Sequence, residues 1–207
     1  MYRAKRVELQ KTIADAPGVS PGANAPHVRG DAKARVTLEE FGDFQCPPCA
    51  TVAMSLSRIE HDYGDKLRVI FRQFPLAMHA HAREAARAAE AAGAQGKFWE
   101  MHDLLFKNQS AWSSSANVAE IFKEYARSLG LELDRFQRDC ANESLEARIN
   151  ADQQRGESRG VKSTPTLFVN GHNLPPASTS ETGLRSALDA VLRGEPIPSQ
   201  SSPTPAK

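Results

Sequence analysis

Residues 34–49 read ARVTLEEFGDFQCPPC and decide the fold. The first half is β-branched and apolar enough for a buried strand, which we predict over residues 34–41. Two cysteines then enclose two prolines, and the chain continues as CATVAMSLSRIEHDYG with helical periodicity. A strand that leads directly into a helix places both thiols at the helix N-terminus.

The elements that follow this helix indicate an α/β unit. Val52, Leu56 and Ile59 share one face of the predicted helix, and Gly64 ends it. The segment 66–75 alternates apolar with polar residues, so we predict a second strand there. A β-α-β unit of this length implies parallel strands joined by a right-handed crossover.

A long helical region interrupts the strands. An Ala-rich stretch, HAREAARAAEAAGAQ, is strongly helix-forming, and four further stretches carry a 3.6-residue apolar repeat. Strand character returns at TPTLFVNG (164–171), which closes on an Asn-Gly turn, and an amphipathic helix stopped by Gly194 follows. The sequence therefore predicts an α/β domain over residues 31–193, with a helical insertion at about 76–158.

The two ends carry weaker patterns. Residues 1–30 are predicted to be a loose N-terminal arm with a short strand or helix near RVELQKTI, and the Pro/Ser-rich residues 194–207 a disordered tail. The first residues are charged without an apolar stretch behind them, unlike a secretory signal, and no apolar run is long enough for a membrane helix. Either the protein is cytoplasmic or a signal was removed.

Composition excludes some classes of protein. With 26 Lys and Arg against 25 Asp and Glu, the net charge is +1, which argues against a nucleic-acid binder. A chain of 207 residues can bury one sizeable core. Three cysteines are too few for a small disulfide-stapled protein, and the odd number leaves one thiol over. We expect a monomer.

The placement of Cys46 and Cys49 favours redox chemistry. Cys46 is predicted to be the exposed N-cap or first-turn residue, with Cys49 further in; the free N–H groups and the helix dipole stabilise a thiolate there. Pro47 and Pro48 suit a first turn and stiffen the loop, but they withhold two N–H groups from the Cys46 sulfur. Pro48 is also expected to delay the regular helix by one residue.

Other roles for the cysteine pair are less well supported. A structural zinc site needs four ligands, yet there is no second Cys-x-x-Cys pair, and His79 and His81 do not share a helix face. A structural disulfide over two residues would close too short a loop to stabilise much. We predict neither a metal nor a cofactor. Cys140 lies one helical turn after Phe136, and we interpret it as a buried free thiol.

Three separated motifs carry a resemblance to a known family. In order along the chain they are VTLEEFGDFQCPPC, FPLAMHAHAREAARAAEAAGAQGKFWEMHDLLF and GVKSTPTLFVNG. They resemble the bacterial thioredoxin-fold thiol–disulfide oxidoreductases typified by DsbA, in the subgroup with a helical insertion that includes domains fused to membrane proteins. The resemblance covers about residues 28–193. It implies a thioredoxin fold with the helical insertion between its βαβ and ββα halves.

The resemblance also implies roles for individual residues. Cys46 corresponds to the nucleophile and Cys49 to the resolving cysteine. Pro165 is the expected cis-proline, and the backbone of Thr164 before it would pair with an extended substrate. Glu40 corresponds to a buried acid that accepts a proton during exchange. On the pattern of its own strand, Glu40 could equally be a strand-end carboxylate that faces solvent.

The implied function is oxidation of protein thiols, in the periplasm or cell envelope, with a membrane quinone-linked partner. The best-known oxidant of the family has a histidine where this chain has Pro48, so the direction of electron flow stays open. A reductase or isomerase supplied by a thioredoxin-like donor is one alternative, and a cytoplasmic location another. A module that binds peptides or a soft metal ion without turnover is a third.

Overall fold

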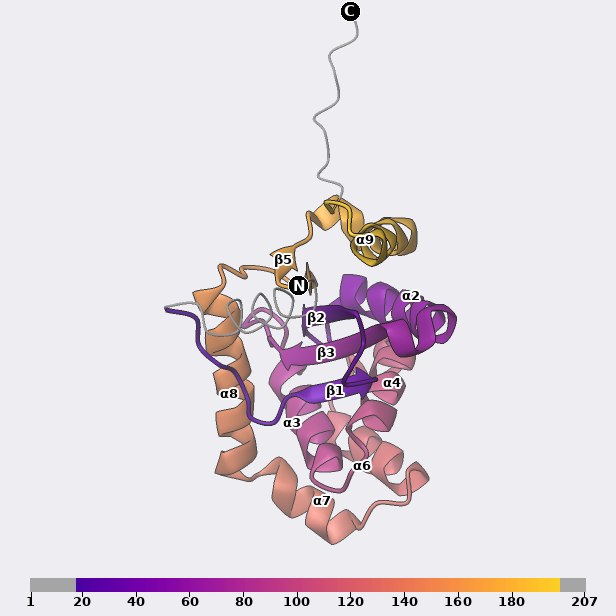
Figure 1. The fold of residues 1–207 in the computed structure, drawn as a ribbon. Helices are drawn as coiled ribbons and strands as arrows, with labels where there is room; N and C mark the ends of the chain where they lie inside the picture. Colours follow the sequence, from indigo (N-terminus) through magenta and orange to yellow (C-terminus); the bar gives the residue numbers. More distant parts are fainter. Residues whose placement is uncertain (1–17, 198–207) are drawn as a thin grey trace, which may run out of the picture.

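The computed structural model describes residues 18–197, and within them a mixed sheet lies between layers of helices (Figure 1). The strand order is β1-β3-β2-β4-β5, where β2 and β3 are parallel and the other pairs antiparallel. The strands are β1 (His27–Gly30), β2 (Val36–Gly42), β3 (Leu67–Gln73), β4 (Thr166–Val169) and β5 (His172–Asn173). The predicted parallel β-α-β unit is confirmed.

Helix α2 (Pro47–Tyr63) joins the two parallel strands, and α9 (Glu181–Arg193) ends the described fold. Between β3 and β4 lies the helical insertion that the sequence predicts. Its helices are α3 (Ala82–Gly93), α4 (Phe98–Lys107), α5 (Gln109–Trp112), α6 (Val118–Ser128), α7 (Leu133–Cys140) and α8 (Glu143–Ser158). The chain thus has an α/β fold with the insertion between its two halves.

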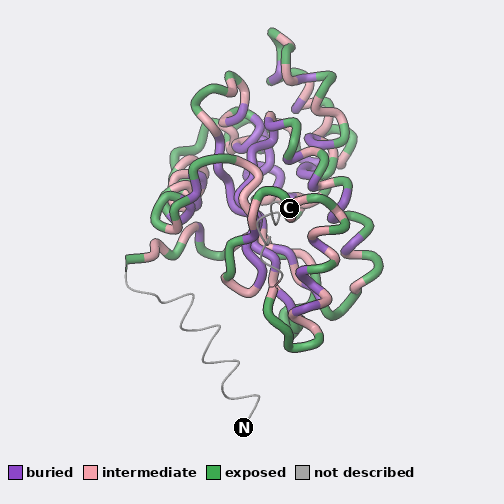
Figure 2. The backbone as a smooth tube through the Cα atoms, turned by 90° about the horizontal axis from the view of Figure 1, so that it is seen from above, coloured by how far each residue is buried: buried purple, intermediate pink, exposed green. Residues whose placement is uncertain are grey.

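Both faces of the central strand β2 are covered. Val36 and Leu38 pack with residues of α2 and α9 on one face, whereas Phe41 packs on the other face with Phe74 and Phe168. Figure 1 shows α8 on the side of the sheet opposite α2, and Figure 2 shows that the buried segments of the backbone lie in the interior of the molecule. Side chains of both parities along β2 are therefore buried.

An aromatic cluster attaches the insertion to the sheet. Phe44 and Phe71, from the β2–α2 loop and β3, pack against Phe98 and Phe106 of α4. The fully buried Trp112 of α5 extends this cluster toward α6. The cluster therefore links the insertion to the sheet through Phe71 of β3, while most of the sheet's apolar residues belong to two other clusters.

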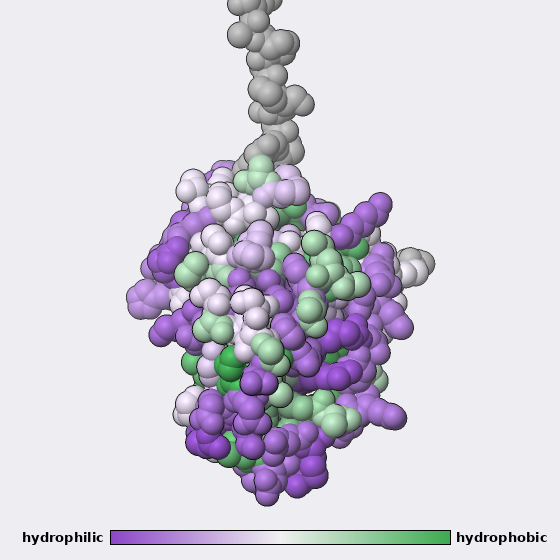
Figure 3. All heavy atoms as spheres, turned by 180° about the vertical axis from the view of Figure 1, so that it is seen from behind, coloured by the Kyte–Doolittle hydropathy of each residue, from purple (hydrophilic) through white to green (hydrophobic). Residues whose placement is uncertain are grey.

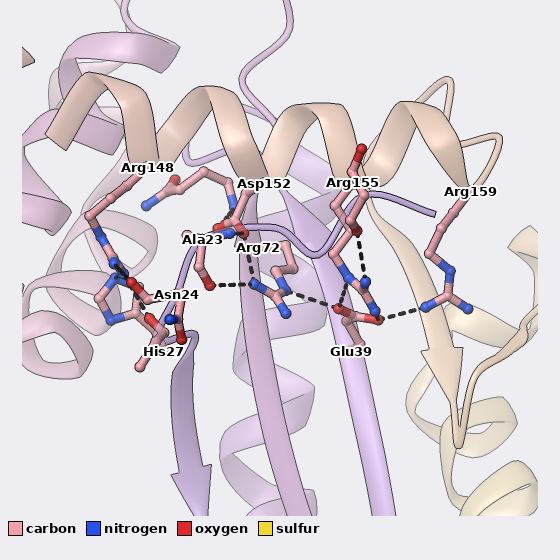
Figure 4. A network of polar contacts seen from close by, with 12 residues as sticks. Ala23, Asn24, His27, Glu39, Arg72, Arg148, Asp152, Arg155 and Arg159 are labelled. Carbon is pink, nitrogen blue, oxygen red and sulfur yellow. Dashed lines mark hydrogen bonds and ion pairs between the residues drawn. The ribbon is translucent and has the colours of Figure 1, made fainter. Parts of the chain in front are cut away.

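A buried polar network lies between β2, β3 and α8 (Figure 4). Glu39 accepts hydrogen bonds from Arg72 (2.9 Å), Arg155 (2.7 Å) and Arg159 (2.7 Å), and Arg72 also donates to Asp152 (2.8 Å). Burial alone would raise the pKa of the Glu39 carboxyl, but hydrogen bonds and positive charge from Arg155 and Arg72 bring it below its usual value. The glutamate is thus held ionised inside the protein.

The same network holds the N-terminal segment, part of which the sequence analysis assigned to a loose arm. Arg72 donates to the Ala23 carbonyl (3.1 Å) and Arg148 to the Asn24 carbonyl (2.8 Å), while β1 pairs with β3. Residues 23–30 are thus attached to the fold, because buried arginines need acceptors and the edge of β3 offers unpaired backbone groups. The element predicted near RVELQKTI lies outside the described residues, as does most of the predicted tail 194–207.

The second half of the sheet follows the predicted turn and helix signals. Asn170 and Gly171, with φ of 45° and 83°, form the turn between β4 and β5. The Ser180 side chain caps α9 by accepting from the Gly183 N–H (3.2 Å), and Gly194 ends the helix with φ of 77°. Gly171 and Gly194 thus adopt left-handed backbone conformations that most other residues reach only with strain.

Within residues 18–197, no helix combines the length and the apolar character needed to cross a bilayer. On the face seen in Figure 3, apolar residues are exposed in separate areas between hydrophilic side chains. The large hydrophobic side chains that are exposed in the described part of the chain are Val28, Met54 and Met78.

Candidate active site

The two prolines form the first turn of α2. Cys46 is the N-cap residue, with extended backbone (φ −78°, ψ 118°), and Pro47 and Pro48 begin the helix. The predicted delay of the helix by one residue is wrong. The first N–H groups of a helix have no intrahelical acceptor, so both prolines fit there without breaking a hydrogen bond.

Cys46 is more enclosed than the sequence predicts. We expected an exposed thiol, but the residue is only 4% exposed, and its Sγ lies 3.3 Å from the carbonyl oxygen of Thr164. The peptide bond between Thr164 and Pro165 is cis, as the motif predicts. The loop that contains this bond lies beside the sulfur and shields it from solvent.

The two thiols differ in acidity. The pKa of Cys46 is lowered to about 6, chiefly by hydrogen bonding from Cys49, against the opposing effect of burial. Cys49 is fully buried, and burial, the hydrogen bond to Cys46 and the charge of Glu40 raise its pKa. Near neutral pH the pair therefore consists of a Cys46 thiolate and a Cys49 thiol, with no disulfide between them in this structure.

Glu40 lies beneath the cysteines and is fully buried. Within the described part of the chain, neither of its carboxylate oxygens has a hydrogen-bond partner. Burial raises its pKa to about 8, with further contributions from the negative charges of Cys46 and Glu60. The solvent-facing alternative is wrong, because α2 covers the face of β2 to which Glu40 points.

The sequence analysis missed Asp43, whose carboxylate is fully buried next to the cysteines. It accepts hydrogen bonds from the backbone N–H groups of Gln45 (2.7 Å) and Leu76 (2.9 Å), and His79 Nδ1 lies 2.7 Å from it. The Asp43 carbonyl also accepts from the Cys46 N–H (3.1 Å). An aspartate that bonds the backbone two residues on is a common turn-forming pattern, and this spacing was the available signal.

The insertion contacts the cysteine loop directly. Gln109 of α5 donates one side-chain amide to the carbonyls of Phe44 (2.7 Å) and Cys46 (2.9 Å). Gln45 donates in return to the carbonyl of Ser113 (2.7 Å). The backbone around Cys46 is thereby fixed from the side of the insertion.

Cys140 lies apart from this constellation. It is a free, half-buried thiol that packs against the edge of the aromatic cluster, so the predicted full burial is only partly met. Burial raises its pKa to about 12, and the charge of Asp139 adds to the effect. It stays protonated at neutral pH and is a poor nucleophile.

Within residues 18–197, no group of three or more His, Cys, Asp and Glu side chains is arranged to hold a metal ion. The two histidines that the sequence analysis weighed as ligands have other partners. His79 pairs with Asp43, and His81 Nδ1 lies 2.6 Å from Glu84.

Comparisons with known proteins identify the family. The thioredoxin family model matches residues 23–190. The crystal structure of DsbA2 from Pseudomonas aeruginosa is 30% identical, with a TM-score of 0.63 over 81% of this chain and 95% of that one. A thioredoxin-like oxidoreductase from Silicibacter pomeroyi is 25% identical, with a TM-score of 0.67 over 89% and 96%. The chain belongs to the thioredoxin family, among its DsbA-like thiol–disulfide oxidoreductases.

Curated relatives with higher identity are longer proteins. The chain is 42% identical over 146 residues to Na(+)/H(+) antiporter NhaA 1 of Salinispora arenicola, and 35% identical over 168 residues to NhaA of Herminiimonas arsenicoxydans. These regions make up 70% and 81% of this chain but only 22% and 26% of the relatives. The chain therefore spans about a quarter of their length, and the likeness concerns one part of each.

Proposed function

We propose that this protein oxidises the thiols of protein substrates through a disulfide between Cys46 and Cys49. The observation that carries the proposal is the difference in acidity within the pair. Cys46 has a pKa of about 6, whereas the pKa of Cys49 is raised. A stabilised thiolate at one cysteine makes it a good leaving group and favours the reduced form of the pair, which is the property of an oxidant.

The exchange proceeds in two substitutions at sulfur. A substrate thiolate attacks Cys46 in the oxidised protein, the Cys46–Cys49 bond breaks, and Cys49 leaves as a thiolate that takes up a proton. A second substrate thiolate then attacks the substrate sulfur of the mixed disulfide and releases Cys46 as a thiolate. The substrate loses two electrons and two protons, and the cysteine pair gains the two electrons.

Glu40 supplies the proton that Cys49 takes up. With a pKa of about 8, its carboxyl is protonated at neutral pH and adjacent to a thiol that is hard to ionise. In the reverse direction the same carboxylate accepts the proton from Cys49 before that residue attacks the mixed disulfide. A buried carboxyl without a hydrogen-bond partner in the described residues is favoured in its neutral form, which supports Glu40 as the group that holds the proton.

The substrate chain binds in extended form beside Cys46, with its backbone against Thr164. The position of the Thr164 carbonyl, 3.3 Å from the Cys46 sulfur, supports this arrangement. Pro165 shapes this loop, and the exposed side chains of Pro47 and Pro48 line the approach from the other side. No residue side chain of the substrate is specified by these contacts, which suits a broad range of protein substrates.

The reduction potential distinguishes an oxidase from its relatives. Because Pro47 and Pro48 provide no N–H to the sulfur, we expect a value between about −270 mV, as in thioredoxin, and about −120 mV, as in DsbA. An oxidase of this poise works in the periplasm or cell envelope and is reoxidised by a membrane quinone-linked partner. A reductase or isomerase supplied by a thioredoxin-like donor would instead have a potential near the lower value.

Catalysed refolding tests the proposal. The oxidised protein should accelerate disulfide formation in a reduced, unfolded substrate, and Cys46→Ser should abolish the effect. Cys140→Ser is the matched control and should retain the wild-type rate. Binding of the unfolded substrate without any acceleration would instead indicate a non-enzymatic module, and strong insulin reduction with a potential near −270 mV would indicate a reductase.

A further inference from the structure

We propose that His79 sets the redox equilibrium of the cysteine pair by acting through Asp43. The inference rests on the proposed function and deepens it, because it names a positioning residue to which the sequence analysis gave no role in the exchange. Neither residue touches the substrate in the scheme above. Their effect is exerted on the Cys46 sulfur through the structure of the loop and its charge.

Asp43 brings a buried negative charge to the N-terminal end of α2. Its side chain is fully buried, three residues before Cys46, and its carbonyl accepts the Cys46 N–H at 3.1 Å. A carboxylate in this position opposes the formation of a thiolate at Cys46. The charge of Asp43 therefore works against the stabilised thiolate on which the proposed chemistry depends, and any group that offsets it favours the reduced pair.

His79 is placed to offset that charge. Within residues 18–197, it is the one side chain that bonds the Asp43 carboxylate, since the other two donors are the neutral backbone N–H groups of Gln45 and Leu76. At 2.7 Å, the contact with His79 Nδ1 has the length of a charge-assisted hydrogen bond. The His79 side chain is 19% exposed, so its ring lies between solvent and the fully buried Asp43 carboxylate.

The loop between β3 and α3 holds the ring in place. The His79 N–H donates to the Leu76 carbonyl (3.0 Å), and the His79 carbonyl accepts from Ala82 (3.2 Å) at the start of α3. Two residues further, the His81 N–H donates to the side chain of Gln45 (2.6 Å). The loop is thus hydrogen-bonded to the cysteine loop on both sides of His79, through Leu76 to Asp43 and through His81 to Gln45. These contacts fix the position of His79 beside Asp43.

The reaction that measures the effect is exchange with glutathione. Two molecules of reduced glutathione convert the protein disulfide to the dithiol and become one molecule of oxidised glutathione. In His79→Ala the Asp43 charge loses its side-chain partner, which destabilises the Cys46 thiolate and hence the reduced protein. The equilibrium constant should shift about fivefold toward the oxidised protein, the scale of one partly screened charge acting on the thiolate.

A double-mutant cycle tests whether the effect passes through Asp43. Asp43→Asn alone should shift the same constant in the opposite direction, toward the dithiol, and His79→Ala should then have no further effect in that background. His81→Ala is the matched control, because its ring pairs with Glu84 and its backbone N–H is retained; it should leave the constant unchanged. If His79→Ala fails to fold, His79→Asn, which keeps a donor but cannot become positive, should still shift the constant toward the oxidised protein.

Thiolate absorbance against pH gives the second readout, since the Cys46 pKa should rise in His79→Ala and fall in Asp43→Asn. The inference would be overturned if His79→Ala left the equilibrium constant unchanged. It would also be overturned if His79→Ala shifted the constant equally in the wild type and in the Asp43→Asn variant. Failure of the proposed function would look different. In that case wild-type protein would equilibrate with glutathione, and the cycle would hold, while refolding of protein substrates would not be accelerated.

Discussion

One helical turn separates two thiols of the same chain that have opposite tendencies to ionise. Cys46, at the N-terminal end of the helix, accepts hydrogen bonding from Cys49, whereas Cys49 is fully buried near Glu40. The environment of each sulfur, rather than the Cys-x-x-Cys spacing, distinguishes the two cysteines and supports Cys46 as the nucleophile of the proposed exchange.

Alkylation of the reduced protein with limiting iodoacetamide at pH 7 should modify Cys46 first. Because only the thiolate reacts, the rate should rise with pH through about 6 and level off above it. Mass spectrometry of peptides identifies the modified residue. Preferential modification of Cys140, whose pKa is about 12, would contradict the assignment.

Glu40 makes stability depend on pH. Its folded-state pKa of about 8 lies above that of an unfolded glutamate, so its contribution is complete below about pH 4 and is lost as the pH rises through 8. Between pH 5 and 9, the free energy of unfolding of the wild type should fall relative to that of Glu40→Gln by up to roughly 4 kcal/mol. Urea denaturation of both proteins in the reduced state measures this, and parallel pH curves would show that Glu40 does not titrate in the fold.

At the level of elements, local sequence signals located most of the helices and strands. Gly64 and Gly194 end their helices as predicted, and the Asn-Gly turn lies between β4 and β5. Strand β1 was missed because four residues of mixed polarity carry little periodic signal and pair with a strand some forty positions later. A proline usually disfavours helical backbone at the residue before it, yet α2 begins at Pro47, directly before Pro48. The first turn tolerates both prolines because its N–H groups have no intrahelical acceptor.

Helix α8 is bound to the sheet through charges as well as through apolar contacts. Asp152 is almost fully buried and shares Arg72 with Glu39. Asp152→Asn should therefore leave Arg72 without one of its two compensating charges and lower the free energy of unfolding by about 3 kcal/mol. Denaturation in urea measures the loss.

The control for this prediction is the exposed ion pair between Glu124 and Arg127 on α6. Glu124→Gln should leave the stability nearly unchanged, since solvent and salt screen surface pairs. An equal loss in both variants would show that the buried network contributes no more than a surface pair does.

For the molecule as a whole, the aromatic cluster decides whether the insertion and the sheet unfold together. Phe106 lies on α4, with its ring centroid 4.9 Å from that of Phe44 and 6.2 Å from that of Phe71. Phe106→Ala should reduce stability by about 3–5 kcal/mol and still give one transition. Tryptophan fluorescence, which reports Trp99 and Trp112 of the insertion, should coincide with far-UV circular dichroism.

Two separate transitions by these probes would show that the insertion is an independent folding unit. Met78→Ala provides the comparison, because that side chain is 82% exposed and its removal should change stability by less than about 0.5 kcal/mol.

Long-range partners explain which parts of the site the sequence could reveal. The cysteines and the cis-proline loop were accessible, because each belongs to a contiguous motif, whereas the strand pattern left open whether Glu40 is buried or faces solvent. Asp43 and His79 lie 36 positions apart, and their contact depends on how the loop after β3 returns to the start of α2. The same holds for Gln109, whose position over the Cys46 carbonyl is set by the packing of the insertion.

The short outer strands have a consequence for behaviour at high concentration. Strand β1 has four residues and β5 only two, so within the described residues neither border of the sheet offers a long row of free backbone groups. Aggregating chains grow by adding strands to such rows. Within the described residues, an extended polypeptide that meets this protein therefore finds no long sheet edge to which a further strand could be added.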